Sequence, residues 1–379
     1  MFNWLRNNIF HFKILYLWLT LIYFCKFYLT PFTFIESTFS VLGYALPIIA
    51  LVLLFMDNKA TVKWPFVCAI GLVYLVSNTN FNYVNDIQIT LLLVLLFSNE
   101  EPVNVIKCTY WFMLGYFVIN IVASCLGIIP NNVTLTSGRT HYIFNFAHHN
   151  KLSLYIFGLM GQIYYLFKKG VFKHKLIIVC SFIGLTVFTL FICESRTGGL
   201  IQLVLTLWCI LDFYLIDKFS TLERLINKIG KFCWVLPILT LVVSLVISVI
   251  FNNESQIWQL LNKFVTGRFY LQHNYYLKNG FPLLGAGLKF CGYGCEVYDY
   301  VDNGLLRFVY ENGLLFTCII TFGISFRIKQ LIKDSNVRIM LIITLTYCMI
   351  TIFEWISYLY CPFILILFSA FLEKKEGNI

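Results

Sequence analysis

The sequence contains few charged residues. Only 12% of its 379 residues are Asp, Glu, Lys or Arg, whereas a soluble domain carries about a quarter. It also lacks the alternating segments of about ten residues that are typical of a membrane β-barrel. No cleavable signal peptide is evident, and we expect the first apolar run to be a retained helix. These absences exclude a single water-soluble core and a membrane barrel.

Apolar residues are abundant. Hydrophobic residues make up 59% of the chain and recur in runs of roughly 16–25 residues, long enough to cross about 30 Å of hydrocarbon as helices. A helix also satisfies its own backbone hydrogen bonds, which lipid does not. The sequence therefore predicts an all-α, polytopic integral membrane protein with a single membrane domain over residues 1–379. About twelve transmembrane helices are expected, at residues 14–30, 39–56, 64–78, 86–98, 104–129, 151–167, 176–193, 198–216, 232–251, 303–325, 337–353 and 356–372.

Basic residues are distributed unevenly between the two ends of these helices. The formal net charge is +10, which on a soluble protein would suggest nucleic acid as a partner. Nineteen of the 28 basic residues fall in the alternate segments that share a side with the N-terminus, and eight fall on the opposite side. Because cytoplasmic loops collect Lys and Arg, the sequence predicts that the N and C termini are cytoplasmic. The positive charge is then a topological signal and not a nucleic-acid footprint.

Two outward-facing segments are long, at about 130–150 and about 252–302. The second is a large extracytoplasmic loop before the tenth helix, and long loops in compact proteins are usually functional. Apolar residues at 257–265 recur at helical spacing, which predicts an amphipathic helix that either lies on the outer membrane surface or packs on neighbouring loops. Most of the thirteen cysteines lie in apolar runs, but Cys291 and Cys295 share this polar loop, and a disulfide between them is left open.

Three outward-facing arginines stand beside glycine or hydroxyl residues. They occur in Ser137-Gly138-Arg139, Ser195-Arg196-Thr197-Gly198 and Thr266-Gly267-Arg268. Ionisable residues at a membrane boundary are costly and commonly functional, and the guanidinium fork matches phosphate oxygens. Together these arginines are candidates for binding a pyrophosphate. The alternative for each one is an interfacial anchor that snorkels to the membrane surface.

Histidines supply candidate proton acceptors. His148 and His149 precede Asn150 at the entry of a helix, and as neighbours they are expected to point to different sides. No Cys, Asp or Glu stands at ligand spacing from them, so we expect no metal site. His273 follows Arg268 by five residues and is either a proton acceptor or a plain loop histidine.

A carboxylate and a glycine-rich run stand at the end of the second long segment. Asp302 and Asn303 open the tenth helix. Asp is a preferred N-cap residue, and Asp302 is alternatively a base or hydrogen-bond acceptor for a sugar hydroxyl. The run at 280–287 is not a dinucleotide fingerprint, because no strand–helix unit surrounds it. We expect a tight turn near a ligand there.

The order of these motifs, and their common outward side, make the chain resemble the O-antigen ligase and Wzy-type polysaccharide polymerase superfamily. The resemblance covers roughly residues 60–330. Ligases of that family typically carry His before the last Asn of the pattern, and Asp302 in this place is more similar to the polymerases of capsule and exopolysaccharide systems. The residues that carry the resemblance are His148-His149-Asn150, Ser195 to Gly198, Gly267-Arg268 with the Pro-Leu-Leu-Gly-Ala-Gly turn after it, and Asp302-Asn303 followed by Gly313.

The resemblance implies a glycosyltransferase of the bacterial cytoplasmic membrane that uses no cofactor and no metal. It would transfer a growing glycan from undecaprenyl pyrophosphate to a lipid-linked repeat unit on the outer face, with a flippase and a chain-length regulator as candidate partners. The leaving pyrophosphate gains charge, which arginines would stabilise; Arg196 and Arg268 are the first choices and Arg139 is the third. Asp302 is the first candidate for the base, and His273 is the second.

Amide and aromatic side chains are further candidates for substrate contacts. Asn150 and Asn303 are expected to bind substrate. Tyr270, Tyr275 and Tyr276 either line a sugar-binding groove or are the aromatic residues expected at any membrane interface.

Two other functions remain open. One is a ligase of the same superfamily, which moves a finished glycan to a different acceptor. The other is a transporter such as a flippase for lipid-linked oligosaccharides, which would place polar residues near the midplane and commonly show an internal repeat. Here the polar residues concentrate in outer loops and no convincing repeat is present, which favours an enzyme.

Overall fold

The computed structural model describes residues 9–25, 33–56, 89, 92–93, 96–97, 100–129, 133–136, 139–146, 148–265, 267–285, 290, 300–332 and 337–353. Two expected spans, 64–78 and 356–372, and most of a third, 86–98, lie outside the described residues. Cys291 and Cys295 also lie outside them, so the disulfide stays open.

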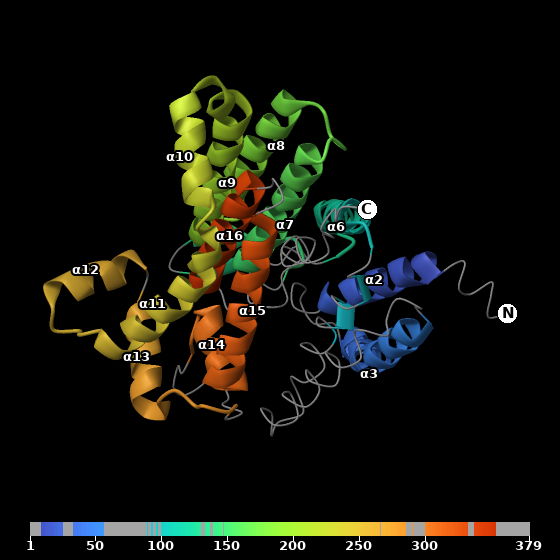
Figure 1. Cartoon of the computed structure of the whole chain (residues 1–379). Coiled ribbons are helices and arrows are strands. Elements are labelled where there is room, and N and C mark those ends of the chain that lie inside the picture. The colour runs from blue at the N-terminus through green and yellow to red at the C-terminus, as the bar shows by residue number, and fades with distance from the viewer. Residues whose placement is uncertain are drawn as a thin grey trace.

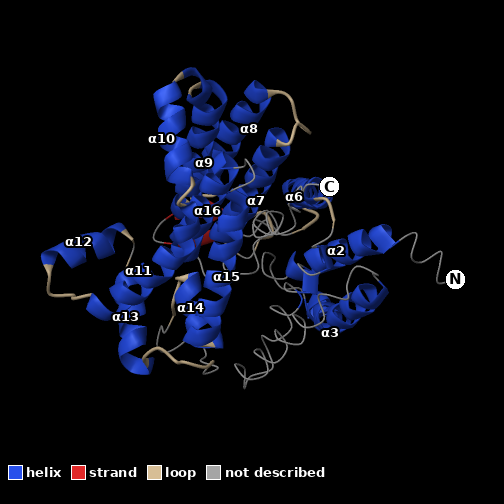
Figure 2. Cartoon of the chain, in the orientation of Figure 1, coloured by secondary structure: helices blue, strands red, loops and turns tan. Residues whose placement is uncertain are grey.

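Helices make up nearly all of the described chain (Figures 1 and 2). The all-α prediction is therefore confirmed as a fold class, with one addition in the segment expected at 130–150. That addition is a hairpin of two antiparallel strands, β1 (Val133–Thr136) and β2 (Arg139–Tyr142). The helices are α2 (Ile9–Cys25), α3 (Thr33–Met56), α6 (Pro102–Cys125), α7 (His149–Lys168), α8 (Lys175–Val187), the π-turn η1 (Phe188–Ile192), α9 (Arg196–Tyr214), η2 (Ile216–Lys218), α10 (Ser220–Gly230), η3 (Cys233–Val235), α11 (Leu236–Ile250), α12 (Gln256–Phe264), α13 (Arg268–Asn279), α14 (Gly304–Asn312), α15 (Leu314–Ile332) and α16 (Val337–Phe353).

Several helical stretches have the length and composition of membrane spans. Within the described ranges, four are long and apolar enough to cross a membrane, at Pro102–Cys125, Lys175–Ile192, Arg196–Lys218 and Ser220–Ile250. Large apolar side chains stay exposed along these stretches, among them Leu176 on α8 and Leu239 on α11. An exposed apolar helix face is what lipid contact requires. The fold is thus that of a helical membrane protein, whereas the number of spans and the cytoplasmic termini stay predictions.

The apolar run expected as one helix at 303–325 is two helices, so that part of the prediction is wrong. The chain breaks at Gly313, where φ is +90°, a value that favours glycine. The backbone N–H of Leu314 donates to Pro282 O at 2.8 Å, and the next N–H donates to Leu283 O at 3.1 Å. A Cβ at Gly313 would lie 2.6 Å from the Leu284 carbonyl carbon. The glycine-rich turn thus packs directly against the α14–α15 junction.

The helix α7 runs through the middle of the main apolar core. It packs between α6 and α9, and the Tyr155 hydroxyl donates to Met113 O of α6 at 3.0 Å. Its 20 residues correspond to about 30 Å at 1.5 Å per residue. Asn150 and Lys168 therefore lie at opposite ends of the bundle, which separates the polar contacts of the protein into two groups.

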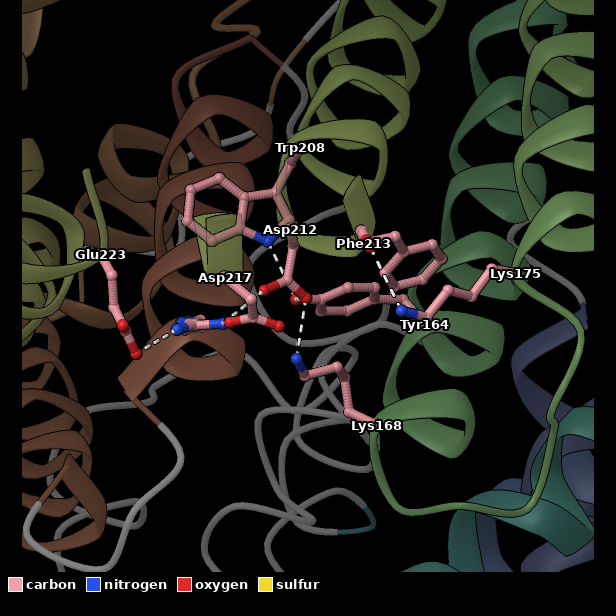
Figure 3. Close-up of polar contacts among 9 residues, drawn as sticks. Tyr164, Lys168, Lys175, Trp208, Asp212, Phe213, Asp217 and Glu223 are labelled. Carbon is pink, nitrogen blue, oxygen red and sulfur yellow. Dashed lines mark hydrogen bonds and ion pairs between the residues drawn. The ribbon is translucent and has the colours of Figure 1, made fainter. Parts of the chain in front are cut away.

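One group surrounds Asp212 near the C-terminal end of α9 (Figure 3). The carboxylate is fully buried and accepts hydrogen bonds from the Tyr164 hydroxyl at 3.0 Å, from Lys168 at 2.8 Å and from Arg338 at 3.3 Å. Trp208 Nε1 donates to the same tyrosine oxygen at 2.9 Å. A buried charge is stable only when it is paired and hydrogen-bonded, and Asp212 has both kinds of partner. It ties α7, α9 and α16 together at this end.

The ion pairs join residues that the alternation of spans assigns to the same side. Arg338 also contacts Asp217 at 2.7 Å and Glu223 at 2.8 Å, and all three were expected on the inner side. Lys13 of α2 pairs with Glu100, 87 positions away, at 2.6 Å, and both again fall on the inner side. The predicted alternation of helix directions is therefore consistent with these contacts, although they do not identify the cytoplasmic face.

Candidate functional site

The expected motifs at Asn150 and Ser195 lie side by side. The Ser195 hydroxyl, which is fully buried, donates to Asn150 Oδ1 at 2.8 Å and lies 3.0 Å from Ser153 Oγ. Ser153 in turn donates to Asn150 O at 2.7 Å. These residues join the first turns of α7 and α9, and we call Asn150, Ser153, Ser195, Arg196 and Gly198 the α7–α9 cluster. Ser153 is a member that the sequence reasoning missed.

Gly198 allows the two helix starts to approach each other closely. A Cβ at this position would overlap the Ser153 side chain and lie 3.1 Å from Ser195 Oγ. Any larger residue would therefore force α7 and α9 apart. The glycine of the Ser-Arg-Thr-Gly motif has a packing role that spacing alone did not reveal.

Arg196 occupies the first turn of α9 and is exposed to solvent. The π-turn η1 precedes it, and Ser195 N donates to Thr189 O at 3.1 Å. Glu194 has a φ of +49°, a left-handed conformation that is costly for a residue other than glycine and is often found at functional sites. Because helix N-termini attract anions, an exposed arginine here is well placed for a phosphate.

His148 and His149 begin α7. His148 is the N-cap residue, and its Nδ1 accepts a hydrogen bond from Asn150 N at 3.2 Å. The two ring centroids are 4.0 Å apart with an interplanar angle of 33°. The expectation that the rings point to different sides is therefore wrong. In the part of the chain that the structure describes, no three His, Cys, Asp or Glu residues are grouped as metal ligands would be.

Arg139 is the first residue of β2, with its Cα paired in register with that of Thr136. The hairpin connects the end of α6 to the start of α7, so its backbone leads into the α7–α9 cluster. Ser137 and Gly138, the other residues of this motif, lie outside the described residues. A role for Arg139 in binding phosphate stays a prediction.

A second cluster brings together residues of the long outer segment. Arg268 begins α13, directly after Gly267, whose φ is +85°. Its Nε lies 3.4 Å from Asp302 Oδ2, although the two residues are 34 positions apart in the chain. Both side chains are partly exposed, at 14% for the arginine and 24% for the aspartate. We call Arg268, His273, Asp302, Asn303 and Arg307 the α13–α14 cluster.

Asn303, and not Asp302, caps α14. Its Oδ1 accepts hydrogen bonds from the backbone N–H groups of Leu305 and Leu306, both at 3.1 Å, and its Nδ2 donates to Ser244 Oγ at 2.9 Å. The capping alternative for Asp302 is therefore wrong, and its carboxylate is not used as a helix cap. Asn303 is only 5% exposed, so these contacts give it a positioning role. Direct binding of substrate by Asn303 stays a prediction.

His273 of α13 and Asn303 at the start of α14 both contact α11. The His273 Nδ1 lies 2.7 Å from Ser248 O, and because a carbonyl only accepts, that nitrogen carries the proton. Ser244 and Ser248 are one turn apart on α11, and residues four apart lie on the same helix face. His273 and Asn303 are therefore anchored about one helical turn apart. The two serines in an apolar run were the sequence signal for this anchor.

Burial and two arginines act on Asp302 in opposite directions. Burial raises the pKa of the Asp302 carboxyl, and the charges of Arg268 and Arg307 oppose that rise. The Arg307 side chain is only 7% exposed. Its Nε bonds to Glu311 at 2.8 Å, and its guanidinium stacks 4.5 Å from the Phe290 ring centroid. Arg307 is therefore part of the packed surroundings of Asp302.

The tyrosines of α13 have different environments. Tyr275 is buried, with its ring 4.6 Å from that of Tyr310 and 5.1 Å from that of Phe290. Tyr275 is thus a core residue and does not line a groove. Tyr270 is exposed, and its ring lies 6.4 Å from Phe251. Tyr276 is half-buried, with its ring 4.6 Å from that of Phe281, and for Tyr270 and Tyr276 the sugar-facing or interfacial role stays a prediction.

The amphipathic helix expected at 257–265 is present as α12, which projects from the end of α11 (Figure 1). Ile257 and Leu260 are exposed, whereas the Trp258 ring lies 5.6 Å from that of Phe251. Most of the apolar face is therefore not covered by neighbouring loops. This favours the first of the two interpretations, a helix on the membrane surface.

The site thus consists of two polar clusters on helix ends in a helical membrane protein. No family model, no curated protein and no solved structure matches the chain. A function for this chain therefore depends on the chemistry of its own residues.

Proposed function

We propose that this chain is a polysaccharide polymerase of the bacterial cytoplasmic membrane. It transfers a growing glycan from undecaprenyl pyrophosphate to a lipid-linked repeat unit at the outer face. The observation that carries this proposal is the Arg268–Asp302 pair, a cation and a carboxylate 3.4 Å apart and both partly exposed. Such a pair supplies the two charges that the transfer needs, one for the leaving pyrophosphate and one for the acceptor hydroxyl.

Asp302 acts as the base in this scheme. A hydroxyl of the acceptor sugar attacks the anomeric carbon of the donor, the bond from that carbon to the pyrophosphate oxygen breaks, and Asp302 takes the hydroxyl proton. The lipid pyrophosphate leaves with the bonding electron pair. Partial burial, which raises the pKa of Asp302, makes the carboxylate a stronger base. His273 is the second candidate, through Nε2, because its Nδ1 donates to Ser248 O.

Arg268 couples donor binding to the activation of Asp302. The pyrophosphate competes with the carboxylate for the guanidinium, because phosphate oxygens match the donor fork. As Arg268 turns toward phosphate, the positive charge that lowers the pKa of Asp302 is neutralised. The carboxylate then becomes more basic when the donor is present. Arg268 and Asp302 stay close to each other because each is next to the N-cap residue of a helix, Gly267 for α13 and Asn303 for α14.

The α7–α9 cluster provides the second position for the pyrophosphate. Arg196 is exposed at the start of α9, where the helix dipole adds to its charge. Asn150 accepts a hydrogen bond from Ser195, so its contribution is to position the start of α7 against the start of α9. Arg139, in the hairpin that precedes α7, is the third candidate for binding the phosphates. In this scheme the charges of Arg268 and Arg196 stabilise the leaving pyrophosphate.

Cells that lack the protein test this proposal directly. They should accumulate single repeat units on lipid at the outer face and lose long surface polysaccharide, as read on a polymer-length gel. Long chains that persist on lipid would instead identify a ligase. Lipid-linked units that build up only on the inner leaflet would identify a flippase. Proteins that supply repeat units or regulate chain length are the expected partners.

A further inference from the structure

The helix α10 has an exposed face that the proposed function does not use. It follows α9 and precedes α11 in the chain, and it packs against α16 at the end of the bundle that carries the Asp212 network (Figures 1 and 3). Ile226 and Gly230 turn inward, and Gly230 packs against Val337 and Leu341 of α16. The other side of the helix is uncovered. This uncovered side carries both apolar and basic side chains. An exposed apolar patch with a polar rim is typical of an interaction site.

The apolar part of this face continues the lipid-facing side of α11. Exposed apolar residues recur at spacings of three or four from α10 through η3 into α11, so they form one stripe along the helix. The stretch Ser220–Ile250 has 31 residues, about 46 Å at 1.5 Å per residue. A hydrocarbon core is about 30 Å thick, and about 40–45 Å with its headgroups, so α10 reaches the headgroup layer. The stripe begins with Leu225, Ile229, Phe232, Val235, Leu239 and Val242.

A row of basic residues runs beside the stripe. Arg224, Lys228 and Lys231 each stand one position before a stripe residue, and all three are exposed. They therefore lie along one edge of the stripe, at the depth of the lipid phosphates. Within the described part of the chain none of them forms an ion pair, because Asp217 and Glu223 bind Arg338. These three basic side chains are therefore available to bind an anionic ligand.

We propose that this α10 surface binds the headgroups of anionic phospholipids. The apolar stripe lies against the acyl chains, and Arg224, Lys228 and Lys231 contact the headgroup phosphates. Lipid is the occupant because the stripe is continuous with the lipid-facing side of a membrane span, and because the row of charges is complementary to anionic headgroups. A bound lipid would also stabilise the end of α10 at which Glu223 forms an ion pair with Arg338.

Lipid retention by the purified full-length protein tests this surface. Phosphatidylglycerol or phosphatidylcholine with the same acyl chains is titrated into detergent-solubilised protein, and bound lipids are counted by native mass spectrometry. The triple variant Arg224→Gln/Lys228→Gln/Lys231→Gln should lose phosphatidylglycerol affinity by roughly 5-fold per residue, on the order of 100-fold in all. Phosphatidylcholine binding should not change. Raising the ionic strength should reduce the preference of the unaltered protein.

The matched control is Lys107→Gln/Lys173→Gln/Lys263→Gln, which removes the same charge from three exposed positions outside α10. It should bind phosphatidylglycerol as the unaltered protein does, and both variants should melt alike in phosphatidylcholine. An equal loss in the control would show that only the total charge matters. Equal retention of the two lipids by the unaltered protein would show that the acyl chains alone are bound and that the basic residues do not contact the headgroups. Either result overturns the proposal.

Discussion

Replacing Arg268 should nearly abolish polymer formation while the protein still reaches the membrane. Loss of a charge-assisted contact to the leaving group costs about 2–4 kcal/mol in the barrier, or about 30- to 1000-fold in rate. The Arg268 side chain is only 14% exposed, so solvent screens its charge weakly. Arg268→Lys keeps the charge but loses the planar fork, and it should retain part of the activity at best.

The pH dependence separates this role from a structural one. Asp302 must be ionised to accept a proton, so the rate falls as the pH drops through its pKa. Arg268 lowers that pKa, and removing the arginine leaves the effect of burial opposed by Arg307 alone. The acidic limb of kcat/KM, which reports the free enzyme, should therefore move to higher pH in Arg268→Gln.

The assay is initial rate against pH in membranes, with protein levels measured by blot. Lys263→Ala is the matched control, because Lys263 is an exposed basic residue on α12 of the same outer segment. It should leave both the rate and the pH profile unchanged. Normal chain length in Arg268→Ala at normal protein levels would refute the assignment. An acidic limb that stays in place would refute the coupling to Asp302.

Three further results are expected. Reporter fusions at Lys173 should read cytoplasmic and fusions at Asn253 should read outside, because of the asymmetry in basic residues. Gly198→Ala should lower the free energy of unfolding by about 1–3 kcal/mol, since its Cβ would overlap Ser153; thermal melting in detergent measures this. Asp212→Asn should cost about 1.5–3 kcal/mol, because the fully buried side chain loses its charge-assisted hydrogen bonds to Lys168 and Arg338; the same melting curve reports it.

Matched variants control the two stability predictions. Gly184→Ala places a Cβ where no atom lies within 4 Å, and it should not lower the melting temperature. Asp217→Asn removes a carboxylate that also binds Arg338 but is 70% exposed, so it should cost less than about 1 kcal/mol. Equal losses within either pair would contradict the packing and burial arguments. Reversed readings at both fusion sites would place the two clusters on the cytoplasmic side.

The lengths of the hydrophobic runs predicted most helices, because a membrane span needs apolar side chains both where it contacts lipid and where it contacts the protein core. The run at 303–325 failed because the break at Gly313 depends on the distant carbonyls of Pro282 and Leu283. The amphipathic helix α10 was not predicted, since it has only 11 residues and basic residues interrupt its short apolar pattern.

The candidate site was predicted in its residue types more than in its roles. Arg268 and Asp302 meet as the order of the motifs suggested. The capping role of Asn303 and the buried setting of Arg307 depend on side-chain contacts with Ser244 and Phe290. Contacts between residues so far apart in the chain leave no periodic pattern, so only the folded structure assigns them.

Reconstitution of the purified protein tests the proposed polymerase activity most directly. Proteoliposomes receive lipid-linked repeat units as the sole substrate, and products are followed by gel and by release of undecaprenyl pyrophosphate. We predict chains of several repeat units with one lipid pyrophosphate released per bond formed, and neither product with Asp302→Asn. Unextended repeat units with the unaltered protein, or undiminished polymer with Asp302→Asn, would contradict it.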